Sequence, residues 1–170
     1  MKMFSKKSSG SLQSLPRTLE GKLFELVFIF LALLSWGFIA WLIGRAPDVV
    51  PTHFDAAGRP NGWGTPLSVV FPCIIITVVG ACMLAGASFP RRVTMPFSVQ
   101  SPRQQLLAAR MLRVLSLLML VLQCVVAVSM LGQAIGYQPD SNAVLIYSCV
   151  GLIILTCIVF TWLIWRARTA

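Results

Sequence analysis

Charged residues are scarce in this chain. Only 11% of its 170 residues are charged, and just five residues are acidic, whereas 57% are hydrophobic. A soluble domain typically carries about 25% charged residues. A chain of this length cannot enclose so much apolar surface in a core of its own. The composition therefore predicts that a lipid bilayer covers much of the molecule.

Groups suited to catalysis or metal binding are also few. The chain has one histidine, His53, and it contains no phosphate-binding glycine loop, dinucleotide fingerprint or zinc-protease motif. Its five cysteines all fall within apolar runs, and their odd number argues against a disulfide framework. We therefore expect no enzyme activity, no cofactor and no metal site.

What the chain has in abundance is long apolar runs. Each is about 20 residues long, enough to cross the hydrocarbon of a bilayer as an α-helix. Their bounds are 23–43, 67–87, 111–134 and 143–164. The first run is too long for a signal peptide, so we expect it to be retained. The sequence predicts an all-α integral membrane protein, a single four-transmembrane-helix bundle over 23–170, after a basic, disordered tail at 1–22.

The basic residues predict the orientation of these helices. Twelve of the 14 lysines and arginines lie in the N-terminal segment, in or beside the loop between the second and third runs, or at the C-terminus. Positively charged flanks stay on the cytoplasmic side, so both termini are expected inside. The net charge of +9 could also suggest nucleic acid, but the charges flank apolar runs, and we expect no nucleic-acid partner.

The loop between the second and third runs carries two local patterns. Apolar residues alternate with polar ones over 93–99, which predicts an extended segment. Ser101, Pro102 and Gln104 then form a helix-start pattern, with a capping serine, proline at the first position and glutamine three residues after the cap. The third helix is therefore expected to begin at about 102 and to project beyond the membrane.

The first outer loop, between the first two runs, is dense in turn-forming residues. Proline, glycine and aspartate recur throughout 46–66, around the single histidine. Asp55 to Gly58 is predicted to form one turn and Asn61-Gly62 another. Such a density of turn residues predicts an ordered outer loop.

This loop also carries a recognisable pattern, Pro-x-x-x-Pro-x-His-Phe-Asp-x-x-Gly-x-Pro-x-x-Trp-Gly, from Pro47 to Gly64. The pattern resembles the bacterial domain-of-unknown-function 1648 membrane family. It is also similar to the N-terminal unit of Sdp-type toxin-immunity and signalling membrane proteins. The resemblance implies a protein of the bacterial cytoplasmic (inner) membrane.

Six residues of the outer loop are the candidate ligand- or partner-binding site: Pro51, His53, Phe54, Asp55, Gly58 and Trp63. His53 and Asp55 share a face of an extended segment. They could form a structural hydrogen-bonded pair, or His53 could respond to pH or ligand; two ligands are too few for zinc. Trp63 and Phe54 could pack onto helix ends or contact a ligand.

The polar groups inside the apolar runs indicate contacts between packed helices more than a transport path, because no charged residue lies in the middle of a run. Gln123 is the most polar mid-span side chain, and we expect it to form a hydrogen bond between helices. The leading functional hypothesis is a binding, sensing or immunity-like module that recognises an extracytoplasmic ligand or partner through residues 45–66. The alternatives are an accessory subunit of a larger membrane complex and an oligomeric channel or transporter component, so a protein partner or a homo-oligomer is expected.

Overall fold

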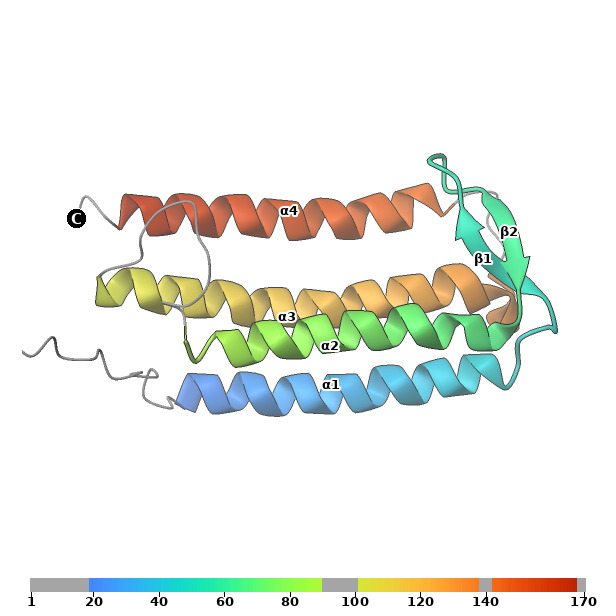
Figure 1. Ribbon diagram of the computed structural model, residues 1–170, viewed down its shortest axis with the longest axis horizontal. Coiled ribbons are helices and arrows are strands. Elements are labelled where there is room, and N and C mark those ends of the chain that lie inside the picture. Colours follow the sequence, from blue (N-terminus) through green and yellow to red (C-terminus); the bar gives the residue numbers. More distant parts are fainter. Residues whose placement is uncertain (1–18, 90–100, 138–141, 168–170) are drawn as a thin grey trace, which may run out of the picture.

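The computed structural model describes residues 19–89, 101–137 and 142–167 (Figure 1). The elements in chain order are α1 (Leu19–Ile43), β1 (Val50–Phe54), β2 (Pro60–Gly64), η1 (Pro66–Val69), α2 (Val70–Gly86), α3 (Pro102–Leu131), η3 (Gly132–Ile135) and α4 (Ala143–Arg166), where η marks a 3₁₀ turn. In this part of the chain four helices are long and apolar enough to cross a membrane, as the sequence predicted. Residues 1–18 of the expected disordered tail at 1–22, and the expected extended segment at 93–99, lie outside the described residues, whereas residues 19–22 are helical and not disordered.

Two helix boundaries differ from the apolar runs. Helix α1 already includes Leu19, four residues before the apolar run, and Glu20 in its first turn forms an ion pair with Arg110 of α3. The second run begins with the 3₁₀ turn η1, and Pro66 stands at its first turn. Hydropathy predicts the stretch of chain that lipid can surround, and the bounds of a helix can differ from that stretch by a few residues.

The start of α3 matches its predicted cap. Ser101 Oγ accepts a hydrogen bond from the Gln104 backbone N–H at 3.2 Å, and Gln104 Oε1 accepts from the Ser101 N–H at 3.1 Å. Gln104 Nε2 also donates to the Ile164 carbonyl of α4 at 3.2 Å. Gln104 therefore takes part in the cap of α3 and also bonds the last turn of α4.

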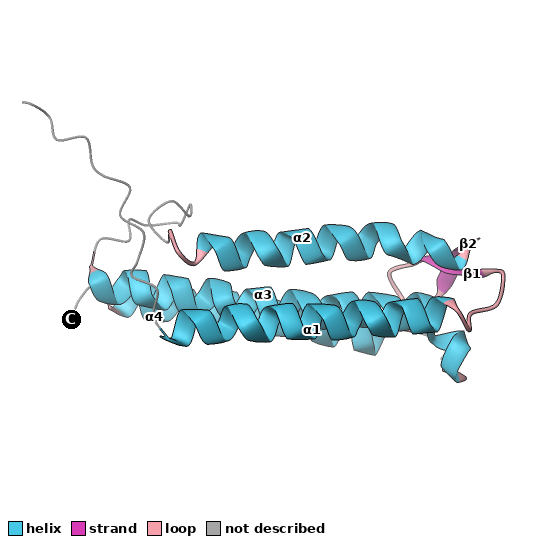
Figure 2. Cartoon of the chain, turned by 90° about the horizontal axis from the view of Figure 1, so that it is seen from below, coloured by secondary structure: helices cyan, strands magenta, loops and turns pink. Residues whose placement is uncertain are grey.

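Helix α3 is the centre of the arrangement (Figures 1 and 2). Helices α1, α2 and α4 all pack against it, and α4 lies on the side of α3 away from α1. Half of the most apolar stretch of α3 is buried, compared with 22%, 17% and 6% for α1, α2 and α4. Three helices therefore surround one central helix, and α4 is the least covered.

The helices alternate in direction, so α1 begins and α4 ends at one end of the molecule, called here the terminal end. Strands β1 and β2 lie at the other, the hairpin end. The main apolar core lies beneath the hairpin. Its buried members are Ile39, Leu42, Val50, Val69, Cys73, Ala127, Met130 and Leu131. Because α1, β1, η1, α2 and α3 all contribute to this core, the hairpin is joined to the helices by packing as well as by the chain.

A hydrogen-bonded network crosses the middle of the three packed helices α1, α2 and α3. The fully buried Gln123 has its Oε1 2.6 Å from the Thr77 hydroxyl, and its Nε2 donates to Ser35 Oγ at 3.4 Å. Trp36 Nε1 donates to Thr77 Oγ1 at 3.2 Å. Each polar group thus has a partner inside an apolar environment, where an unpaired one would be costly. The predicted interhelical role of Gln123 is confirmed.

Candidate functional site

The outer loop is a two-stranded antiparallel hairpin. Strands β1 and β2 pair Pro51 with Trp63 and Phe54 with Pro60, with a register shift at His53. The prediction of an ordered loop is confirmed, but the expectation of an all-α fold missed these strands. Two prolines within the strands made a sheet hard to read from sequence. They are tolerated because a two-stranded hairpin has only edge strands.

The tip of the hairpin is the turn predicted at Asp55 to Gly58. Asp55 Oδ1 accepts hydrogen bonds from the backbone N–H groups of Ala57 and Arg59, both at 2.9 Å. The Asp55 carbonyl accepts from the Gly58 N–H at 2.9 Å. Gly58 has a φ of +72°, which a residue with a side chain adopts only with strain. The aspartate and the glycine therefore both serve to hold the turn.

The second predicted turn, at Asn61-Gly62, is wrong. Both residues lie within β2. A Cβ on Gly62 would lie 2.9 Å from the His53 Cβ on the facing strand, so glycine is needed there for close strand approach. Asn-Gly favours a turn locally, but the Asp55 turn has already reversed the chain, and pairing with β1 keeps Asn61 and Gly62 extended.

His53 pairs with Asn61 and not with Asp55. Its Nδ1 lies within hydrogen-bond distance of Asn61 Oδ1 across the hairpin. The possible hydrogen-bonded pair of His53 with Asp55 is not formed, because the Asp55 carboxylate accepts from backbone N–H groups of the tip. No group of three or more histidine, cysteine, aspartate or glutamate side chains that could hold a metal occurs among residues 19–89, 101–137 and 142–167.

The structure divides the six candidate residues into two sets. Pro51 and Gly58 are buried, Phe54 packs against the main core, and Asp55 holds the turn. His53 and Trp63 are exposed, Trp63 by 58%. Asp55 is also exposed but is engaged in the turn, so His53 and Trp63 are the exposed candidates without a role in holding the hairpin.

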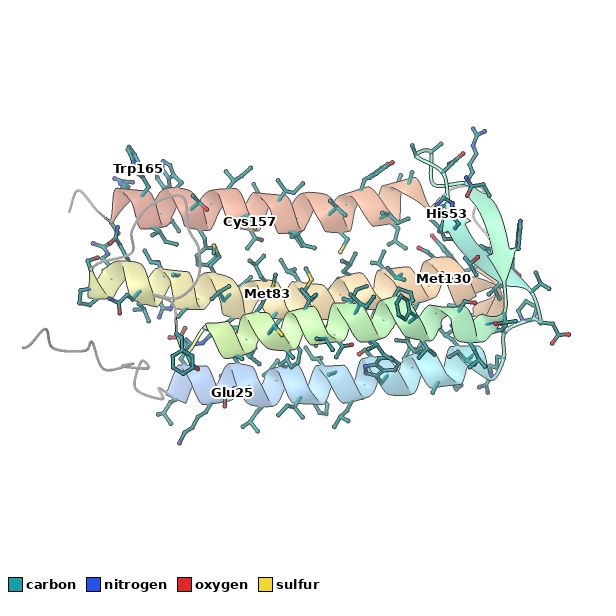
Figure 3. All side chains as sticks on the ribbon, in the orientation of Figure 1. Glu25, His53, Met83, Met130, Cys157 and Trp165 are labelled. Carbon is teal, nitrogen blue, oxygen red and sulfur yellow. The ribbon has the colours of Figure 1, made fainter. Side chains whose placement is uncertain are left out.

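Asn61 joins the two exposed candidates and was missed by the sequence reasoning. It is exposed, contacts His53 across the hairpin, and lies two residues before Trp63 on β2. That spacing was visible in the sequence but was obscured by the turn assigned to Asn61. We call His53, Asn61 and Trp63 the outer face of the hairpin; Figure 3 shows His53 at the hairpin end.

The hairpin tip rests on the start of α4. The Gly58 carbonyl accepts a hydrogen bond from the Asn142 N–H at 2.9 Å, and the Tyr147 hydroxyl donates to the Ala56 carbonyl. Asn142 is itself buried, and its Nδ2 donates to the Ser129 carbonyl of α3 at 3.4 Å. The hairpin therefore spans from the start of α2 to the start of α4 (Figure 1).

The architecture thus combines four membrane-length helices with a rigid hairpin that joins α1 to α2 and contacts α4. Residues 30–78 match the family described as Domain of unknown function (DUF1648). The match runs from within α1 through the hairpin into α2, and it confirms the resemblance stated from the proline, histidine, aspartate and tryptophan pattern. No curated protein and no solved structure matches the chain. The similarity to Sdp-type proteins stays a prediction.

Proposed function

We propose that this protein crosses the bacterial cytoplasmic membrane four times and recognises an extracytoplasmic ligand or partner through the outer face of its hairpin. Orientation follows from charge. Among the described residues, the terminal end holds Lys22, Arg103, Arg110, Arg113 and Arg166, whereas the hairpin end holds Arg45 and Arg59. The terminal end is therefore cytoplasmic and the hairpin end lies outside.

The observation that carries recognition is the outer face itself. An imidazole and an amide in contact, and an indole two residues further along β2, are exposed on a hairpin whose turn, core contact and helix contact are made by other residues. A large aromatic exposed beside hydrogen-bonding groups is the composition of binding hot spots. The rigid frame lowers the entropic cost of binding, because these side chains need little further ordering. A peptide segment, an envelope component or the outer domain of a partner supplies the apolar and amide groups that such a face binds.

The contact with α4 offers a route for the effect of binding. Strands β1 and β2 run directly from the outer face into the tip, and the tip contacts α4 through Ala56 and Gly58. Helix α4 otherwise packs against α3, and its most apolar stretch is the least buried of the four. A ligand that shifts the hairpin therefore acts on the least buried helix. In an immunity-like role the same surface captures a toxic peptide before it reaches the membrane.

Photo-crosslinking tests the proposal in intact cells. A benzophenone amino acid at position 63 is expected to form a discrete adduct with a partner, identified by mass spectrometry. The matched control is the same probe at Asp48, an exposed position outside both strands of the hairpin. His53→Ala and Asn61→Ala should weaken the adduct while changing thermal stability in detergent little, since exposed substitutions cost within about 0.5 kcal/mol. Adducts equal to the Asp48 control, or stability lost in step with crosslinking, would contradict recognition by this face.

A structural accessory subunit is the second candidate, and the exposure of α4 favours it. Only 6% of the most apolar stretch of α4 is buried within the protein, so most of its surface is available to another protein in the membrane. In that case a stoichiometric partner accompanies the protein through mild-detergent purification. The outer-face variants would leave this partner bound, which separates the two candidates.

A further inference from the structure

A half-buried carboxylate lies in a groove between α1 and α2. The groove has a volume of about 450 Å³, and it is lined by Glu25, Phe28, Ile29, Ala81, Leu84, Ala85, Ser88 and Phe89. Figure 3 shows Glu25 on α1 towards the terminal end, the end opposite His53. Most of the lining is apolar, and Glu25 is its only ionisable side chain. The groove thus combines a lipid-like wall with one negative charge.

Glu25 has no ion-pair or hydrogen-bond partner within the described residues. Two of the three arginines of α3 at this end, Arg110 and Arg113, lie 2.9 and 3.7 Å from Glu20. Glu25 lies just inside the apolar run that begins at residue 23, about 3 Å along the helix at a rise of 1.5 Å per residue. A carboxylate at the edge of an apolar run is stabilised when a cation meets it.

Lys22 is the complementary group on the same helix. It is exposed and, like Glu25, has no partner in the part of the chain that the structure describes. Residues three apart lie on one face of a helix, about 4.5 Å apart along its axis. No ion pair joins Lys22 to Glu25 within one chain. Within the described residues, one face of α1 thus carries a cation and, one turn further along, an anion, and neither has an ion-pair partner.

We propose that a second copy of this chain docks its α1 at the α1–α2 groove, so that Lys22 of each copy pairs with Glu25 of the other. A twofold axis along the membrane normal makes the two α1 helices parallel and places equal residues at equal depth. The flexible stem of Lys22 then spans the single turn that separates it from the other Glu25. Exposed Leu26 and Ile29 supply apolar contact beside the ion pairs.

The opposite wall of the groove suits the approach of a helix. Ala81 and Ala85 lie on one face of α2 at a spacing of four residues, and Ser88 follows the end of the helix. Small residues at such spacings allow helices to pack closely in membranes. The Lys22–Glu25 pairs determine which helix binds and in which register. The small residues of α2 leave room for that helix to approach closely. This inference is independent of recognition by the outer face.

Charge exchange tests the dimer. Full-length protein with a donor or an acceptor dye on its C-terminus is reconstituted in phosphatidylcholine vesicles, and energy transfer is followed as the protein-to-lipid ratio changes. The wild type should self-associate. Lys22→Glu and Glu25→Lys should each weaken association by about tenfold or more, because each change breaks both symmetry-related pairs. The double variant carrying both changes should recover to within about threefold of wild type.

Two matched controls separate the pair from bulk charge. Arg103→Glu changes an exposed cation at the same end, and Asp48→Lys changes an exposed acid at the other end, with the same changes in net charge. Neither should alter association. Glu25→Gln keeps the side-chain shape and should weaken association without adding repulsion. It tests the ion pair even if the charge-reversed Glu25→Lys variant fails to fold. A monomeric wild type, a double variant as weak as the single ones, or equal loss in Arg103→Glu would overturn the proposal.

Discussion

Gly58 of the hairpin tip lies directly against Ala143 at the start of α4. A Cβ placed on Gly58 would lie 2.8 Å from the Ala143 Cα, closer than real side chains come to backbone atoms. Gly58 also has a positive φ of +72°. One residue therefore meets two separate demands, one from the turn and one from a helix far along the chain.

Gly58→Ala should destabilise the protein by about 2–4 kcal/mol, because alanine bears the strain of positive φ and also collides with α4. Gly136→Ala is the matched control. Gly136 has a φ of +74° but nothing within 4 Å of an added Cβ, so it should cost only about 1–2 kcal/mol. Thermal unfolding in detergent measures both. Equal losses for the two variants would mean that the contact of the tip with α4 contributes nothing.

The central network should respond unequally to loss of its members. Thr77→Val leaves Trp36 Nε1 without an acceptor and Gln123 Oε1 without a donor, which should cost about 1–3 kcal/mol. Gln123→Leu should cost about 1 kcal/mol or less, because the hydroxyls of Thr77 and Ser35 can still donate to backbone carbonyls at 2.8 and 2.9 Å. Unfolding in denaturing detergent gives both values, and a larger loss in Gln123→Leu would contradict this order.

The cap of α3 should contribute measurably to stability. Ser101→Ala removes the hydroxyl that accepts from the Gln104 N–H, at a cost of about 1 kcal/mol. Thr65→Ala is a suitable control, because Thr65 precedes η1 without a side-chain capping hydrogen bond. Amide hydrogen exchange should speed up in the first turn of α3 in Ser101→Ala and stay unchanged in η1 in the control. Unchanged exchange at Gln104 would show that the cap is dispensable.

Cysteine labelling should place the two ends on opposite sides of the membrane. In a cysteine-free background, Asp48→Cys at the hairpin end should react with a membrane-impermeant maleimide in intact cells. Arg103→Cys at the terminal end should react only after permeabilisation. The reason is the concentration of lysine and arginine at the terminal end. The reverse pattern would invert the proposed orientation and leave the outer face in the cytoplasm.

Local patterns in the sequence were enough for the helices, the α3 cap and the first turn. Apolar runs of membrane length form helices because backbone groups away from water must bond within their own segment. Ser101 with Gln104, and Asp55 with Gly58, act over three or four residues, so their roles can be read from neighbours along the chain. The family pattern was equally local, because all its residues lie between Pro47 and Gly64.

Tertiary structure decided everything that joins distant segments. Asn61 became a strand residue paired with His53 because β1 and β2 meet, although Asn-Gly alone favours a turn. The sequence could mark Gln123 as polar in an apolar run, but not Thr77 and Ser35 as its partners on two other helices. Such contacts depend on which faces of the helices meet, and hydropathy is nearly uniform around a helix that lipid can cover on any side. For the same reason, only the packed structure shows that α3 is central, that α4 is barely covered, and that the hairpin reaches α4.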